Sequence, residues 1–308
     1  MAASLDIVKI SCTAICVKPA HIYRHITPAL RGAFGYTLNR LFDKGDNNPS
    51  LYQTLFKNET ENTYSDEYVS GKPNPYVFES PARAQTSLSA GDTLTFSLTL
   101  FGNACAYVPE SIFTIQQMLK WNLMNTSQAF ELQSAANCFT GETLYANGAV
   151  NSNIGEIARP WRWTDGISPE IGARRVLIRF LEPASIKENG EPAGLISFSL
   201  LIRAILNRLR LLTSVYGGVF QINRDEIEEN ADTVKTYRNE LHDSSFITFS
   251  RTQMKKKNYH GLTGDVYYEG DLTQFLPYIN IGSVLHVGRN TVMGMGQYVW
   301  KIIVNEKS

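Results

Sequence analysis

The sequences RRVLIRFL at residues 174–181 and FSLLIRAILNRLRLL at residues 198–212 decide the fold of the second half of the chain. The first predicts a β-strand, and the second has apolar residues at helical spacing and predicts an amphipathic helix. Four further elements are expected after them: strands at 246–249 and 262–268, a short helix at 272–281 and a closing strand at 297–304. The predicted order is therefore strand, helix, strand, strand, helix, strand.

The first half of the chain predicts the same order. LDIVKISCTAICV at residues 5–17 alternates roughly like a strand, and Thr27-Pro28 predicts the start of a helix. The expected elements are strands at 5–17, 76–78, 92–101 and 137–145, with helices at 29–42 and 111–124. This order describes the ferredoxin-like split βαβ unit. We therefore predict an α+β chain of two tandem ferredoxin-like (RRM-like) domains.

The domain boundary is expected where the chain becomes polar and contains glycine, around residues 159–166. The prediction is an N-terminal domain at residues 1–165 and a C-terminal domain at residues 166–308, the second with a glycine-rich loop. The two halves share the order of their elements without obvious sequence identity.

Composition restricts the class of protein. Of 308 residues, 43% are hydrophobic, which supplies one or two packed cores and excludes disorder for most of the length. Four cysteines are too few for a disulfide-rich scaffold. No apolar run reaches the roughly 18 residues of a membrane span, and the first residues lack a signal-peptide pattern. The expectation is a soluble cytoplasmic protein with no membrane association.

The net charge of zero argues against a nucleic-acid partner when it is taken alone, because RNA affinity depends on neutralising phosphates. The distribution is more informative. Residues 166–308 carry 17 basic and 15 acidic side chains, and five of those acids lie in residues 225–232. A local basic face is thus possible on the second domain.

Metal and cofactor sites are not expected. Cys12 and Cys16 would point to one face of a strand, and Cys105 and Cys138 are isolated, whereas structural zinc requires four ligands in close pairs. We interpret the cysteines as buried structural thiols. No HExxH motif, calcium loop or carboxylate cluster is present, so metal-dependent chemistry is not predicted.

The segment LHVGRNTVMGMGQY at residues 285–298 is the most specific local signal. It lacks the Gly-Lys-Ser/Thr of a P-loop, and a strand rather than a helix follows it. Gly288, Gly294 and Gly296 would let the backbone approach a phosphate closely, with Arg289 adding charge and His286 nearby. The alternative interpretation is a tight connection that requires positive φ angles.

A second signal is the basic run SRTQMKKKNYH at residues 250–260, between two predicted strands. Arg251, Lys255, Lys256 and Lys257 would grip an RNA backbone, and the rings of Tyr259 and His260 would be available for stacking. A solvated hairpin tip is the competing interpretation.

Histidine is scarce, with five copies in the chain. His21 and His25 flank Tyr23 and Arg24 immediately before the first predicted helix, on a loop where polar groups can be exposed. Imidazoles in such a place are candidates for general acid–base catalysis.

Several blocks of this sequence resemble, in order, the CRISPR-associated repeat-processing endoribonucleases of the RAMP superfamily. The blocks are LRGAFG at 30–35, FLEPASIK at 180–187 followed by 198–217, SRTQ at 250–253 leading into GLTGDVYYEG at 261–270, and the glycine-rich stretch 286–298. The family fold is two tandem ferredoxin-like domains, which agrees with the order of elements derived above.

The resemblance implies metal-independent cleavage of precursor CRISPR RNA, in which a ribose 2′-OH attacks the adjacent phosphate. The products are a 2′,3′-cyclic phosphate and a 5′-OH. The family's catalytic histidine often lies in the first domain, at or after the first helix, but this chain has no histidine between Arg31 and Lys235. The predicted catalytic residues are therefore His25, His21 and Tyr23, with Arg31 nearby as an RNA contact. His286 in the glycine-rich loop is the rival candidate for the catalytic histidine.

The implied partners are CRISPR repeat RNA, as precursor and mature guide RNA, other CRISPR effector or adaptation proteins, and a second copy in a homodimer. No cofactor is implied. Two alternatives remain open at this point. One is a non-catalytic RAMP-type RNA-binding subunit of a CRISPR effector complex, and the other is a structural protein without a nucleic-acid role.

Overall fold

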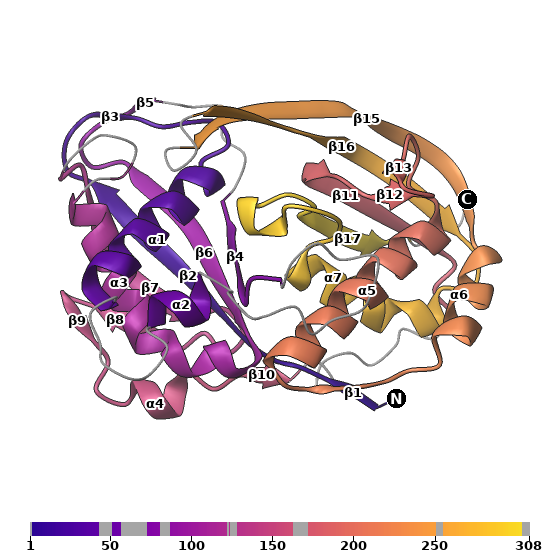
Figure 1. The fold of residues 1–308 in the computed structure, drawn as a ribbon, viewed down its shortest axis with the longest axis horizontal. Helices are drawn as coiled ribbons and strands as arrows, with labels where there is room; N and C mark the ends of the chain where they lie inside the picture. The colour runs from indigo at the N-terminus through magenta and orange to yellow at the C-terminus, as the bar shows by residue number, and fades with distance from the viewer. Residues whose placement is uncertain are drawn as a thin grey trace. The chain divides into compact units, whose positions relative to one another are not determined.

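The computed structural model describes residues 2–42, 51–56, 73–80, 87–121, 123, 128–162, 172–250 and 255–303. The chain forms two compact units (Figure 1). The N-terminal unit comprises residues 4–162 and 211–218, and the C-terminal unit comprises residues 1–3, 163–210 and 219–308. The predicted boundary at residues 165 and 166 lies outside the described residues.

The N-terminal unit contains a mostly antiparallel sheet with helices α1 (Thr27–Phe42) and α3 (Val108–Trp121). Its four main strands are β2 (Asp6–Cys16), β4 (Tyr76–Glu79), β6 (Thr93–Phe101) and β7 (Phe130–Asn137), in the spatial order β4-β6-β2-β7. Numbered from one to four along the chain, these strands have the order 2-3-1-4. With one helix after the first strand and one after the third, this is the predicted ferredoxin-like topology.

Shorter elements complete this unit. They are β3 (Ala20–His21), α2 (Leu51–Leu55), β5 (Ser87–Leu88), η1 (Gly102–Tyr107), β8 (Thr143–Ala146), β9 (Ala149–Val150), α4 (Ile154–Ile157) and β10 (Trp161–Arg162). Strands β8 and β9 extend the sheet beyond β7, and β10 pairs with the start of β2.

The predicted strand at residues 137–145 is wrong. The fourth strand ends at Asn137, and the chain then turns before β8 begins at Thr143. The Asn137 side-chain oxygen accepts a hydrogen bond from the Phe139 amide at 3.0 Å, and Gly141 has a φ of +75°. This side-chain-to-backbone bond stabilises a turn where an apolar pattern suggested continuation.

The core of the N-terminal unit lies between the sheet and α1 and α3. Ile10, Cys12 and Ala14 of β2 are fully buried, as are Leu30 and Phe34 of α1. Burial raises the pKa of the Cys12 thiol, which agrees with a structural role. Cys16 and Cys105 are buried too, but Cys138 is exposed, so the expectation of buried thiols is wrong for that residue.

The C-terminal unit repeats the topology with β11 (Arg175–Ala184), α5 (Phe198–Tyr216), β15 (Lys235–Ser250), β16 (Lys255–Glu269), α7 (Leu276–Leu285) and β17 (Tyr298–Ile302). The sheet order is β15-β16-β11-β17, which is again 2-3-1-4. The predicted α+β fold class is therefore confirmed, with the ferredoxin-like topology present in each half of the chain. Additional short elements are β1 (Ala2–Ser4), β12 (Lys187–Glu188), β13 (Glu191–Pro192), β14 (Val219–Gln221), α6 (Arg224–Asp232), η3 (Thr273–Phe275) and η4 (Thr291–Met293).

Helices α5 and α7 pack on one face of this sheet. The Phe198 ring of α5 lies 5.1 Å from the Tyr268 ring of β16, and the Tyr298 hydroxyl donates to the Ile279 carbonyl of α7 at 2.6 Å. Burial raises the pKa of both tyrosines well above the usual value. The opposite face of the sheet carries the charged side chains described below.

The hairpin formed by β15 and β16 is much longer than the strands predicted at 246–249 and 262–268 (Figure 1). Strand β11 pairs with β16 only between Leu262 and Glu269. We call residues 235–243 and 262–269, together with the paired strand β11, the hairpin base. Beyond it, residues 244–250 and 255–261 pair only with each other, and we call this two-stranded extension the ribbon.

Candidate functional site

The glycine-rich loop at residues 286–297 joins α7 to β17 and is packed against its own unit. Gly294 and Gly296 are buried with φ angles of +86° and +69°. A Cβ atom on Gly296 would overlap the Val287 carbonyl oxygen, and one on Gly288 would lie 2.5 Å from the Ser185 carbonyl oxygen. The glycines therefore allow backbone to pass against backbone inside the protein.

His286 shares this packing role. It has no exposed surface, its φ is +60°, and its Nδ1 lies 3.2 Å from the Met295 carbonyl oxygen. The structure thus favours the tight-connection interpretation for His286, Gly288, Gly294 and Gly296 over direct contact with RNA. Sequence alone could not separate these interpretations, because both require positive φ.

Arg289 and Asn290 are the exposed residues of the loop. The Arg289 side chain is exposed, while its backbone amide donates to the Ser185 carbonyl at 2.9 Å and fixes the position of the residue. Of the predicted RNA contacts in this loop, Arg289 has the charge and exposure that binding a phosphate requires.

The inner face of the ribbon packs on the same loop. The Phe246 and Tyr259 rings stack with centroids 5.3 Å apart, and these two residues form a cluster with Met295, against which Met293 packs. Tyr259 is only 8% exposed, so the expectation that its ring is available for stacking on RNA is wrong. The glycine-rich loop instead anchors the ribbon.

The basic run lies on the ribbon. Lys255 and Lys256 are exposed and Lys257 is half-buried, and residues 244–261 contain no Asp or Glu. Within the described part of the chain, no ion pair joins these three lysines to an acid. Arg251 lies outside the described residues. The ribbon therefore presents uncompensated positive charge.

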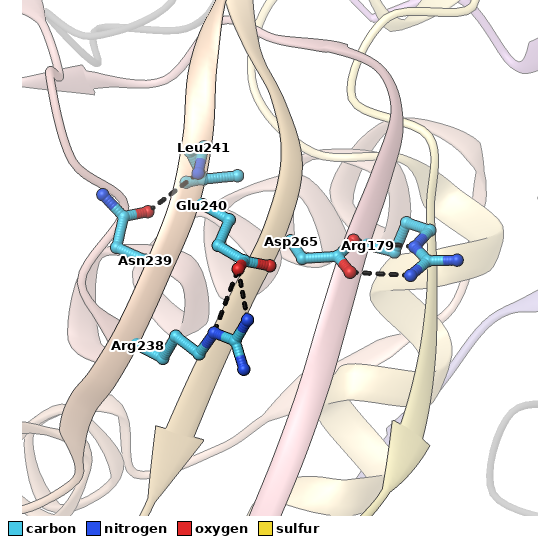
Figure 2. A network of polar contacts seen from close by, with 6 residues as sticks. All are labelled: Arg179, Arg238, Asn239, Glu240, Leu241 and Asp265. Atoms are coloured by element: carbon cyan, nitrogen blue, oxygen red, sulfur yellow. Dashed lines mark hydrogen bonds and ion pairs between the residues drawn. The ribbon is translucent and has the colours of Figure 1, made fainter.

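The hairpin base has the opposite arrangement, which sequence reasoning missed. Its outward face carries Arg179 paired with Asp265 through two hydrogen bonds of 2.7 and 2.6 Å, and Arg238 bonded to Glu240 (Figure 2). The Arg179 guanidinium lowers the pKa of Asp265 below its usual value. Arg175 and Arg179 lie four residues apart on β11 and therefore on one face of the strand, and this spacing was the available signal.

Two tyrosines complete that face. The Arg238 guanidinium lies 5.0 Å from the centre of the Tyr267 ring, and Arg175 lies 5.1 Å from that of Tyr237. Arg175 also pairs with Glu269 at 2.8 Å. Each arginine of the base thus has a partner within the protein, so a phosphate would have to compete for it.

The predicted catalytic residues lie on a short segment between β3 and α1 in the N-terminal unit. His21 ends β3 and is exposed, Tyr23 is 55% exposed, and His25 is half-buried two residues before α1 begins. The N-terminus of a 16-residue helix favours an approaching anion. Two imidazoles and a phenol are therefore available within five residues.

Arg31 points elsewhere. Its guanidinium lies 4.5 Å from the centre of the Phe56 ring, inside the N-terminal unit, and its side chain interacts with buried Tyr76. The structure favours a packing role for Arg31 over the predicted contact with RNA.

In the described ranges, no three His, Cys, Asp or Glu side chains lie together as a group that could hold a metal ion. Over the same ranges, no helix is both long and apolar enough to cross a membrane.

Comparison with protein families divides the chain in the same way as its fold. Residues 5–156 match a family described as an N-terminal domain. Residues 178–298 match the family of the CRISPR-associated endoribonuclease Cas6. An uncharacterized protein of Archaeoglobus fulgidus is 24% identical over 257 residues, which cover 80% of this chain and 78% of that protein.

Solved structures share the fold over nearly the whole chain. Thermus thermophilus Cas6 superposes with a TM-score of 0.57 at 15% identity, covering 98% of this chain and 100% of that one. A Cas6 product complex gives a TM-score of 0.58 at 16% identity, covering 96% and 99%. A chain of a partial Cas6-RT-Cas1–Cas2 complex gives 0.64 at 11% identity, and 99% of this chain spans 47% of that longer polypeptide.

Proposed function

We propose that this chain, whose residues 178–298 match the Cas6 endoribonuclease family and whose fold is shared with solved Cas6 structures, cleaves precursor CRISPR RNA within each repeat by a metal-independent reaction. A ribose 2′-OH attacks the adjacent phosphate, the bond to the 5′-oxygen breaks, and the products carry a 2′,3′-cyclic phosphate and a 5′-OH. The observation that carries the proposal is the segment from His21 to His25, which offers two imidazoles and a phenol before α1.

The reaction needs a base near the 2′-OH, an acid near the leaving 5′-oxygen, and cations around the phosphorane-like transition state. We assign His25 as the general acid or base and His21 as the second candidate. Tyr23, which is 55% exposed, supplies a hydroxyl for the developing charge.

Binding of the repeat RNA is assigned to exposed cations of the C-terminal unit. Lys255, Lys256 and Lys257 of the ribbon form no ion pair with an acid among the described residues, and Arg289 is exposed on the loop that anchors the ribbon. Arg251 remains a proposed contact. Uncompensated lysines release counterions when phosphate binds, so this surface should give a salt-dependent affinity.

The proposal is tested by incubating the protein with the host's own repeat RNA in EDTA and analysing the end groups of the products. Cleavage that yields a cyclic phosphate is the expected result. Tight binding without cleavage would instead identify a non-catalytic RAMP-type subunit that holds guide RNA in an effector complex.

Replacing His25 by Ala tests whether His25 is the general acid or base. We expect a loss of roughly 10²–10⁴ in the single-turnover rate with little change in affinity, the usual size of a lost proton transfer. His286→Ala is not a suitable control because His286 is buried, whereas His242→Ala, at an exposed position outside the ribbon, is suitable. A wild-type rate for His25→Ala would move the role to His21.

The proposed partners are precursor and mature CRISPR RNA, together with CRISPR effector or adaptation proteins. The adaptation proteins are suggested by the likeness to a chain of a Cas6-RT-Cas1–Cas2 complex. A homodimer and a cytoplasmic location stay predictions, which size-exclusion chromatography and cell fractionation would test.

A further inference from the structure

The outer face of the ribbon carries two apolar side chains that are exposed to solvent. Ile247 is 65% exposed and Phe249 is 55% exposed. The inner face already holds the cluster of Phe246, Tyr259 and Met295 that anchors the ribbon. The outer apolar residues therefore lie in solvent on the side away from that anchor.

The strand register determines the neighbours of these side chains. Phe249 lies directly opposite Lys256, and Ile247 lies opposite Asn258. Residues directly opposite each other in an antiparallel pair share a face, so Phe249 and Lys256 are neighbours on the outer face. The result is an exposed aromatic ring beside an ammonium group that forms no ion pair with the described residues.

This combination selects a class of ligand. A flat apolar ring favours a flat apolar partner, and a lysine without a carboxylate favours an anion. A nucleobase joined to its phosphate has both properties. A protein partner would need an aromatic residue beside an acidic one to match this surface. Residues 244–261 contain no acid, so the ribbon could not pair with the basic groups of such a partner.

We propose that Phe249 and Ile247 form a stacking platform for the exposed face of a nucleobase, with Lys256 holding the adjacent phosphate. This inference rests on the proposed function and deepens it, because it predicts that the ribbon recognises an unpaired base or a helix end in addition to RNA charge. The exposed base face can come from single-stranded RNA or from the terminal pair of a stem.

The test compares Phe249→Ala with Phe249→Trp and with Val299→Ala, an exposed apolar residue of the same unit on β17. The probes are the host repeat RNA, an oligouridine of about ten nucleotides and a blunt-ended RNA duplex. Affinity is measured by fluorescence anisotropy at several salt concentrations. Thermal melting checks that each variant is folded.

We expect Phe249→Ala to weaken binding by roughly 5- to 100-fold, the range for a lost base–aromatic stack. Phe249→Trp should restore binding and Val299→Ala should leave it unchanged. The salt dependence should stay the same, because stacking releases no counterions. A loss confined to oligouridine assigns the platform to single-stranded RNA, and a loss confined to the duplex assigns it to a stem end.

If Phe249→Ala binds all three RNA probes with wild-type affinity, the inference is overturned. A loss of binding to a protein partner in that variant would not rescue it. The two proposals fail separately. Repeat RNA that is bound but not cleaved, with the Phe249 effect present, refutes the nuclease and leaves the platform standing. Normal cleavage with no Phe249 effect refutes the platform alone.

Discussion

The two halves of the β15–β16 hairpin use positive charge in opposite ways. In the base, Arg175, Arg179 and Arg238 are each held by a carboxylate on the same sheet face. In the ribbon, three consecutive lysines have no acid within residues 244–261. Surface pairs contribute little to stability, and unpaired cations are the ones available to phosphate. The difference indicates that local pairing, rather than net charge, determines where a neutral protein can bind RNA.

The anchor of the ribbon gives the largest expected effect. Gly296→Val would place a Cβ atom against the Val287 carbonyl at a φ of +69°, and we expect it to destabilise the C-terminal unit by about 4 kcal/mol or more. Urea unfolding, with hydrogen exchange of peptides from each unit, measures the loss.

Gly190→Val is the matched control, because Gly190 also has a positive φ but has open space at its Cβ. It should lose only the roughly 1–3 kcal/mol of backbone strain. If Gly296→Val stays folded and loses only RNA binding, the loop contacts RNA directly and our packing interpretation is wrong.

Removing the ribbon's charge should have an intermediate effect. Changing Lys255, Lys256 and Lys257 together to Ala should weaken repeat binding and reduce the slope of log affinity on log salt by up to about three phosphate equivalents. Cleavage at saturating protein should persist. The measurement is a salt titration of binding by anisotropy.

The charge-neutral double variant Arg179→Gln with Asp265→Asn is the control in the base, and its salt slope should match that of the wild type. An unchanged slope in the lysine variant would remove the ribbon from the RNA path.

Removing a carboxylate partner from an arginine of the hairpin base should give the smallest effect. Glu240→Gln removes the partner of Arg238, and we expect the freed guanidinium to raise the salt slope by up to about one phosphate equivalent, with a gain of a few-fold in affinity. Glu142→Gln, an exposed acid of the N-terminal unit, serves as the control. A decrease in affinity would contradict the idea that the carboxylate keeps Arg238 from RNA.

Much of the fold was predictable from the sequence because its information is local. Alternation with a period of two in residues 92–101 and helical spacing in residues 198–212 are set by backbone geometry, so the strands and helices followed from short windows. Their order then restricted the topology to the ferredoxin-like arrangement in both halves. The segment from His21 to His25 was proposed as a catalytic segment from its residue types and its place before a helix, and that assignment stays a prediction.

Only the tertiary structure decided which side chains of the candidate site face solvent. The register of the ribbon places Phe249 outward and Tyr259 inward, and a slip of one residue would exchange the two faces. The sequence of residues 251–254, Arg-Thr-Gln-Met, contains no Asn-Gly or Asp-Gly signature that would fix this register.

The glycine-rich loop could not be interpreted from the sequence for the same reason. Its positive φ angles were expected, but Gly288 packs on the backbone of Ser185, which is far away in the sequence, and Met295 packs on Phe246 and Tyr259 of the ribbon. Local sequence therefore determined the conformation of the chain there, and only long-range packing determined that the conformation serves to hold the ribbon in place.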